Sequence, residues 1–174
     1  MSTRIEIRKA VPGDATAACE LLRRSIEDGC RADHQGQPGV LDAWLGNKTP
    51  ANVATWFASS TNYALVAESE GQLVGLTLMT PAGKVALCYV QPDALRCGVG
   101  RALLGAMEEQ ARAASISKLF LHSPPGASTF FERHGYNNAG KEKSCFGLEC
   151  DLLWKRLDGA CDPAAKKRFC NCGE

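Results

Sequence analysis

The chain has 174 residues, enough for one domain with a substantial core. Hydrophobic residues make up 45%, charged residues 22%, and the formal net charge is +1. This balance gives no basic footprint for nucleic acid and no charge pattern for a membrane surface. Neither a run of 18 apolar residues nor an apolar leader is found, so we expect a cytoplasmic protein without a transmembrane helix.

Nine cysteines are an unusual feature, and in a cytoplasmic protein we expect them to be reduced. Most stand in apolar runs, where cysteine packs as a small hydrophobic residue. Cys161, Cys170 and Cys172 differ because they stand in a polar segment, residues 159–174. They form no CxxC pair and no histidine accompanies them, so we expect no metal site there. We interpret 159–174 as a mobile tail with oxidisable thiols after a single domain, residues 1–158; zinc in the tail is the alternative.

The N-terminal part predicts one strand and then mainly helices. Alternating residues in RIEIRKA favour a half-buried strand, and Asp14 is suited to be the N-cap of the helix that follows. Gly, Asp and Pro in segment 28–39 predict a loop. Two short helices should follow, one around VLDAW and one in TPANVATWFASS, where Thr49 caps and Pro50 takes the first helical position.

The middle of the chain predicts a β-meander followed by a long helix. Short turns separate three β-rich runs, YALVAE, QLVGLTLM and KVALCYV. In the helix that follows, one face is apolar and carries Leu103, Leu104, Met107 and Ala111.

After that helix the chain predicts a strand, a helix and a last strand. The strand KLFLHS should lie parallel to KVALCYV, because a helix connects them. PPGASTFFERHG predicts a second helix that ends at Gly135, and CFGLECDLLWKRL predicts the last strand.

The stretch LRCGVGRALL, residues 95–104, places two poor helix formers where the long helix should begin. The first amides of a helix lack internal partners, and a residue without Cβ lets an anion approach them closely. Arg96 and Arg101 could add charge-assisted contacts to the same anion. A Walker loop is excluded because no GKS or GKT is present, and a GxGxxG fingerprint fails at Leu103. A simple turn remains the alternative to a pyrophosphate site.

Four segments then match a known pattern in order and spacing. LCYVQPDALRCGVGRALLGAMEEQA resembles the acyl-CoA-binding core of the GNAT superfamily of N-acyltransferases, and ASTFFERHGY resembles its downstream helix and turn. GQLVG and IRKAVPGD resemble its central hairpin and its beginning, so the resemblance covers roughly residues 4–155. It implies an α+β fold with a central mixed sheet of about seven strands, splayed between strands 4 and 5 and flanked by about four helices.

The resemblance also implies acetyl-CoA as co-substrate and assigns residues to it. The pantetheine arm would lie in the splay, and the pyrophosphate would lie at the start of the long helix. The family's Arg or Gln at the head of the pyrophosphate motif is Leu95 here, with Arg96 one place later. The cofactor-binding residues carried over are Tyr89 and Val90 for pantetheine, and Arg96, Cys97, Gly98, Val99, Gly100 and Arg101 for the pyrophosphate.

The catalytic residues stay unassigned. Many relatives carry a tyrosine that can protonate the CoA thiolate where this chain has Phe131, so that donor is missing; Tyr136 is a nearby candidate, at a position that usually packs in the core. KVALCYV lacks the Glu that often serves as base. Glu68 and Glu70 flank a hairpin turn and are expected to be solvated, and His34 is expected to be exposed in a loop. His122 could line the cleft, whereas His134 is expected to interact favourably with the C-terminus of a helix. Acylation of Cys88 is disfavoured because no His–Asp pair accompanies it.

We expect an N-acetyltransferase in which a primary amine of a small molecule or an exposed peptide attacks the thioester directly. A CoA-binding sensor without turnover is the alternative, and a thiol-based metal or redox protein is a third possibility. The acceptor pocket should include the loop region 28–48, where Asp28 and Asp33 could hold a cationic amine beside Arg31. No nucleic-acid or membrane partner is expected, and a homodimer formed through the last strands stays open.

Overall fold

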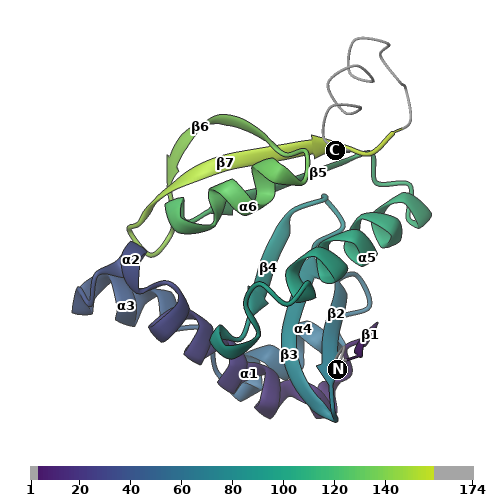
Figure 1. Ribbon diagram of the computed structural model, residues 1–174, viewed down its shortest axis with the longest axis horizontal. Coiled ribbons are helices and arrows are strands. Elements are labelled where there is room, and N and C mark those ends of the chain that lie inside the picture. Colours follow the sequence, from purple (N-terminus) through teal and green to yellow (C-terminus); the bar gives the residue numbers. More distant parts are fainter. Residues whose placement is uncertain (1–3, 159–174) are drawn as a thin grey trace.

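The computed structural model describes residues 4–158, which form seven strands in two antiparallel sheets (Figure 1). The four-stranded sheet has the order β1 (Ile5–Lys9), β2 (Tyr63–Ser69), β3 (Gln72–Met79) and β4 (Val85–Val90). The three-stranded sheet has the order β5 (Lys118–Ser123), β7 (Glu149–Arg156) and β6 (Asn137–Lys143).

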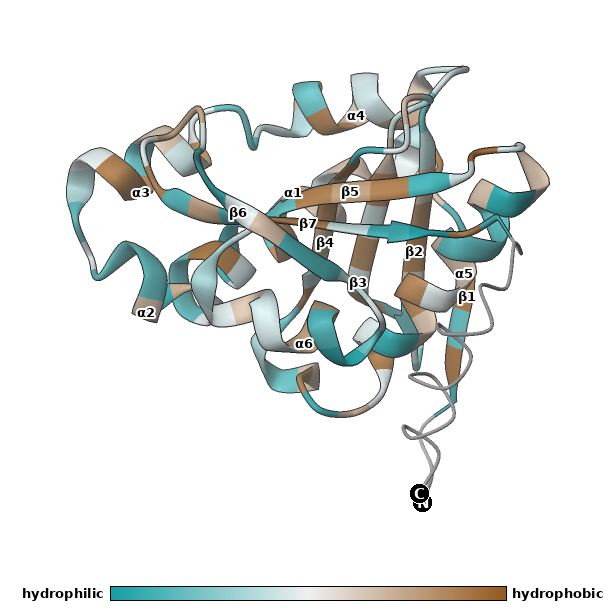
Figure 2. Cartoon of the chain, turned by 90° about the horizontal axis from the view of Figure 1, so that it is seen from above, coloured by the Kyte–Doolittle hydropathy of each residue, from teal (hydrophilic) through white to brown (hydrophobic). Residues whose placement is uncertain are grey.

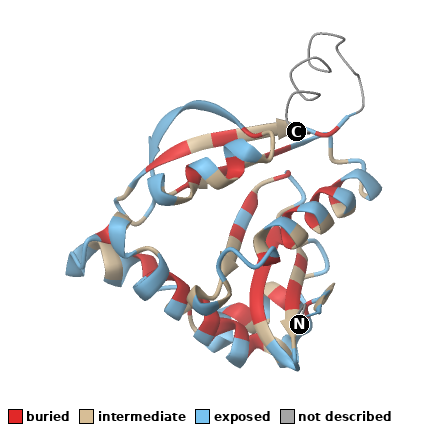
Figure 3. Cartoon of the chain, in the orientation of Figure 1, coloured by how far each residue is buried: buried red, intermediate tan, exposed pale blue. Residues whose placement is uncertain are grey.

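Six α-helices flank these sheets rather than about four: α1 (Ala15–Arg24), α2 (Arg31–His34), α3 (Pro38–Leu45), α4 (Pro50–Ala58), α5 (Val99–Ala113) and α6 (Ser128–Arg133). The apolar stripe expected in the long helix is buried in α5. Helix α4 and helix α6 lie on opposite sides of the molecule (Figure 2). Buried residues line the faces that helices and sheets turn toward one another (Figure 3). None of the helices in the described part has the length and apolar character needed to cross a membrane.

The two sheets meet at one end only. Lys84 and Phe120 form a single parallel bridge, and the Phe120 N–H donates to the Gly83 carbonyl over 3.0 Å. Ala86 is an extra residue in β4, because Leu87 pairs with Leu78 and Val85 pairs with Met79. The bulge lies two residues beyond that bridge, on the part of β4 that diverges from β5. The seven strands and the splay between the fourth and fifth are therefore confirmed, but the expected parallel pairing is reduced to one bridge, and the strands form two antiparallel sheets instead of one mixed sheet.

The prediction of a loop over 28–39 was wrong. Ser25–Gly29 form a π-helical turn, α2 follows, and α3 begins at Pro38. His34 explains the difference: it is buried instead of exposed, and its Nε2 lies 3.0 Å from the Ile26 carbonyl oxygen. Its Nδ1 accepts from the Gly36 N–H over 2.9 Å. The ring therefore satisfies backbone groups that the composition suggested would face water.

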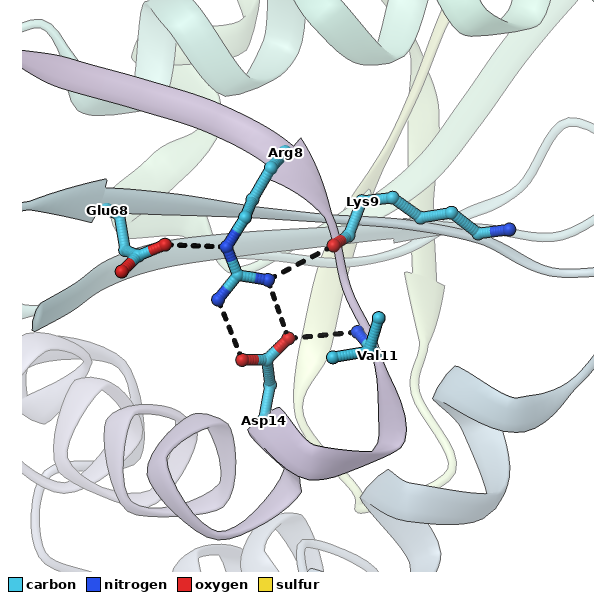
Figure 4. A network of polar contacts seen from close by, with 5 residues as sticks. All are labelled: Arg8, Lys9, Val11, Asp14 and Glu68. Carbon is cyan, nitrogen blue, oxygen red and sulfur yellow. Dashed lines mark hydrogen bonds and ion pairs between the residues drawn. The ribbon is translucent and has the colours of Figure 1, made fainter. Parts of the chain in front are cut away.

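Asp14 is the N-cap residue of α1, but its carboxylate does not bond to the helix. It accepts two hydrogen bonds from the Arg8 guanidinium, at 2.8 and 2.9 Å, and one from the Val11 N–H (Figure 4). Arg8 also donates to Glu68 on β2 over 2.6 Å. The hydrogen bond from Arg8 lowers the pKa of Asp14. This network ties the end of β1 to the start of α1.

Candidate active site

Left-handed residues shape the start of α5. Strand β4 ends at Val90, a 3-10 turn follows over Pro92–Ala94, and Leu95 is half exposed. Arg96 has a φ of +63°, and Gly98, the N-cap, has a φ of +84°. A Cβ atom disfavours this conformation, so glycine is the favoured residue at position 98, and the backbone of Arg96 is strained.

The amides in this turn lack protein acceptors. The first backbone bond of α5 runs from the Ala102 N–H to the Gly98 carbonyl over 3.0 Å. Within residues 4–158, no acceptor is found for the N–H groups from Arg96 to Arg101. A Cβ added to Gly98 would meet no atom within 4 Å, so the space above these amides is open. The partial positive charge of a 15-residue helix adds to these donors, so the turn is suited to bind an anion.

Gly100 serves a different purpose from Gly98. A Cβ on Gly100 would lie 3.1 Å from Cζ of Phe130 and 3.7 Å from Cγ2 of Val90. The missing side chain thus lets α6 pack against the first turn of α5. Arg101 is exposed on the same turn, and the Cys97 thiol is exposed and lies 3.6 Å from the Leu95 carbonyl oxygen.

One edge of β4 is directed into the splay. The Gln91 N–H donates to Val74 on β3 over 2.9 Å, and the Leu87 carbonyl accepts from Thr77 on the same side. Because peptide groups alternate along a strand, those of Cys88 and Val90 face away from β3. The Val90 carbonyl accepts from the Ser25 hydroxyl over 3.1 Å. The remaining groups of this edge can pair with an amide-bearing chain as a further strand would.

The side chain of Tyr89 has a structural partner. Its hydroxyl accepts a hydrogen bond from Trp44 Nε1 over 3.1 Å, and burial raises its pKa. Of the two residues assigned to pantetheine, Val90 therefore turns its peptide group toward the splay, whereas Tyr89 uses its side chain to hold α3.

Two contacts join the helices before β2 to the three-stranded sheet. The Asp33 carboxylate of α2 accepts from the Gly126 N–H over 2.9 Å, and Trp44 stacks on Phe146 with ring centres 4.7 Å apart. These contacts join the region before β2 to the turns after β5 and β6. Asp33 thus bonds to backbone, while Asp28 forms an exposed pair with Arg31 at 3.4 Å.

No tyrosine hydroxyl is available as a proton donor at either Phe131 or Tyr136. Phe131 is buried and packs edge-on against Tyr136, with ring centres 5.7 Å apart. The Tyr136 hydroxyl is buried without a hydrogen-bond partner in the described part of the chain. Burial, and then the nearby Glu108 carboxylate, raise the pKa of Tyr136. The ring belongs to the core between α5 and the three-stranded sheet.

The remaining candidate residues are Glu70, His134, Cys88 and His122, and their surroundings differ. Glu70 is exposed in the β2–β3 turn. His134 Nδ1 lies 2.7 Å from the Phe130 carbonyl oxygen at the end of α6, as expected for a helix C-terminus. Burial raises the pKa of the Cys88 thiol to about 12, which disfavours a thiolate nucleophile. His122 differs, because its Nε2 lies 2.8 Å from the Glu142 carboxylate and its side chain is 25% exposed.

Comparison with known proteins decides the family. The model of the acetyltransferase (GNAT) domain matches residues 32–150. The chain belongs to the GNAT acetyltransferase family. No curated protein matches it.

Solved structures of GNAT proteins share the fold at low sequence identity. A GCN5-related N-acetyltransferase from Rhodopseudomonas palustris has a TM-score of 0.80 and 22% identity, with 90% of this chain and 98% of that chain covered. PaiA N-acetyltransferase from Thermoplasma acidophilum, in complex with coenzyme A, has a TM-score of 0.73 and 18% identity, with 88% of this chain and 99% of that chain covered. YncA of Salmonella typhimurium, described as a putative acetyltransferase with its cofactor acetyl-CoA, has a TM-score of 0.69 and 20% identity, with 92% of this chain and 98% of that chain covered.

The sequence predicted the glycine turn before α5 but missed the contacts that surround it. The contacts Asp33–Gly126, Trp44–Phe146 and His122–Glu142 join segments far apart in the chain, and no local pattern announces them. No group of three His, Cys, Asp or Glu side chains suited to a metal ion occurs within residues 4–158. The cysteines of the tail lie outside the described residues.

Proposed function

We propose that this GNAT protein transfers an acetyl group from acetyl-CoA to a primary amine of a small molecule or of an exposed peptide. The observation that carries the proposal is the run of unpaired amides from Arg96 to Arg101, open to solvent above Gly98. These donors suit a diphosphate, and the free edge of β4 leads from them into the splay. An extended amide-bearing arm fits that edge, so this chain's residues suit coenzyme A at both ends of the path.

Acetyl-CoA supplies the activated acetyl group. The protein's contribution is to hold it in the splay and to bring the amine to it in one orientation, which by itself can accelerate the reaction strongly. The amine enters from the side bounded by α2, α3 and the β6–β7 turn. The CoA-bound relatives support the cofactor class, and the amine class is inferred from the family's chemistry.

Release of free thiol from acetyl-CoA tests the proposal. The purified chain is incubated with acetyl-CoA and, separately, tyramine, spermidine, kanamycin and a glycyl peptide. We expect amine-dependent thiol release with at least one of them. Binding of acetyl-CoA without amine-dependent release from any of them would contradict the transferase assignment.

A matched pair of variants tests the binding site itself. Gly98→Ala and Gly71→Ala both place a Cβ at a left-handed residue with no neighbour within 4 Å. Each should lower the free energy of unfolding by about 1–2 kcal/mol. Only Gly98→Ala should weaken acetyl-CoA binding, by about tenfold or more in calorimetry. Equal affinity in both variants would remove the turn from the binding site.

A CoA-binding sensor is the second candidate function. It is favoured by one observation: Phe131 and Tyr136 leave no tyrosine hydroxyl from α6 or its following turn at the surface of the cleft. A sensor would bind acetyl-CoA with the same dependence on Gly98 and release no thiol with any amine.

A further inference from the structure

The pair His122–Glu142 is a reactive group that the cofactor site does not use. Strand β5 buries Leu119, Leu121 and Ser123 against the helices, and the alternate side chains face the other way. His122 is therefore on the face of the three-stranded sheet opposite to α6. Its side chain is 25% exposed, so the imidazole is accessible from solvent on that face.

The register places His122 at the mouth of the splay. Phe120 forms the only parallel bridge between β4 and β5 in the described structure, with Lys84. His122 is two residues beyond that bridge on β5, and Ala86 is two residues beyond it on β4. Ala86 is the bulged residue and is exposed in a strand whose other members are covered. Counted from the bridge, His122 and the bulged Ala86 therefore occupy matching positions on the two strands, just beyond the point where β4 and β5 are joined.

Glu142 determines which ring nitrogen is free. An ionised carboxylate only accepts hydrogen bonds, so Nε2 of His122 carries the proton that is shared with Glu142 over 2.8 Å. Nδ1 then holds a lone pair, and no partner for it is found among residues 4–158. In the β5–β7 pairing, the residue opposite His122 is Leu152, which is uncharged. Strand β7 therefore places no charged side chain directly opposite His122 that could replace Glu142 as its partner. This is the arrangement by which a carboxylate orients a histidine base.

We infer that His122 is the general base of the acetyl transfer and that Glu142 is its positioning residue; this inference rests on the proposed function. The amine nitrogen forms a bond to the acetyl carbon, and its proton moves to Nδ1 of His122, directly or through one water. The carbon–sulfur bond breaks, and its electron pair leaves with the CoA thiolate. His122 then returns the proton to the solvent or to the thiolate. Glu142 stabilises the imidazolium that exists between these transfers.

The test compares His122→Gln with wild type, using the amine that gave thiol release. A general base contributes about 10²–10⁴-fold, so we expect kcat/KM for the amine to fall at least 100-fold at pH 7. Acetyl-CoA affinity in calorimetry should stay within twofold. The loss should shrink as the pH rises toward the pKa of the free amine, because the variant then receives an acceptor that is already neutral. Imidazole added to the solution should partly restore the thiol release of His122→Ala.

Two carboxylate variants separate a base from a surface ion pair. Glu142→Gln should lower kcat about tenfold, because the amide still accepts from Nε2 but cannot stabilise the imidazolium. Glu149→Gln is the matched control: it removes a carboxylate from the neighbouring strand whose one ion pair within residues 4–158 is with Lys141, at 3.7 Å, and it should leave kcat unchanged. Nitrogen NMR should show the proton of His122 on Nε2 in wild type.

The outcomes are distinct. If kcat/KM of His122→Gln for the amine stays within threefold of wild type at pH 7, or falls by the same factor at every pH, the inference is overturned and the proposed function stands. A wild-type protein that binds acetyl-CoA and releases no thiol with any amine overturns both.

Discussion

Gly75 on β3 packs against the start of α5, where we propose that coenzyme A binds, and Gly75→Ala should measure how tightly α5 is packed there. An added Cβ would lie 2.7 Å from Cδ1 of Leu103, 2.9 Å from Cγ1 of Val99 and 3.2 Å from the Tyr89 carbonyl oxygen. The two side chains belong to the first turns of α5, and the carbonyl belongs to β4. Relief therefore requires the start of α5 to move away from the sheet.

The magnitude follows from two opposing effects. With room available, burying a methyl group would stabilise by about 0.8 kcal/mol, and replacing glycine in a strand would add about 0.5–1 kcal/mol. Overpacking of a filled core costs about 1–3 kcal/mol, and contacts this short place Gly75→Ala at the upper end or beyond. We expect a net loss of about 1–2 kcal/mol, together with weaker acetyl-CoA binding, because the amides of the first turn shift.

Urea denaturation followed by tryptophan fluorescence measures this change. With a slope of about 2 kcal/mol per M, the midpoint should fall by roughly 0.5–1 M. Gly105→Ala is the control on the same helix: its Cβ would meet nothing within 4 Å, and it should stabilise by about 0.5–1 kcal/mol. A Gly75→Ala protein as stable as wild type, with unchanged acetyl-CoA affinity, would refute the reasoning about how α5 is held.

Three further substitutions test the scaffold. Lys155→Met should lower the free energy of unfolding by about 2–3 kcal/mol, because it leaves the Glu108 carboxylate, 2.5 Å from Lys155 Nζ, buried without its partner; urea midpoints measure this. Asp14→Asn should cost about 1 kcal/mol at pH 7. Arg8 lowers the pKa of Asp14, so this contribution exists above the unfolded-state pKa near 4 and disappears as the pH falls through the lower folded-state pKa; melting curves of the two proteins should converge below pH 4. Thr49→Ala removes the side-chain oxygen that caps α4 and should cost about 1 kcal/mol in the same urea assay.

Where local pattern and tertiary environment agree, the sequence predicted the structure. Helix α5 was predictable because its apolar stripe faces the core, and the turn before it because Gly98 is needed for a left-handed residue. Strands β2 to β4 were predictable from their β-branched and apolar runs between turns. These are also the elements to which we assign coenzyme A, so the sequence could point to that part of the proposed site.

Other elements depend on contacts that no local pattern encodes. Strand β6 reads NNAGKEK and is exposed throughout, so it has no alternation to reveal it and exists because it pairs with β7. Helix α2 is four residues long, and the His34 ring and the Asp33–Gly126 bond hold it in place. The face proposed to receive the amine is made from such segments, which is why the catalytic groups could not be assigned from sequence.

Hydrogen exchange of the backbone amides from Arg96 to Arg101 tests the central claim most directly. In the free protein these amides should exchange fast, because they have no protein acceptor. Saturating acetyl-CoA should slow them by at least tenfold and leave the amide of Gly71, in the distant β2–β3 turn, unchanged. Bound acetyl-CoA with no change in these exchange rates would contradict the claim that the start of α5 binds the diphosphate.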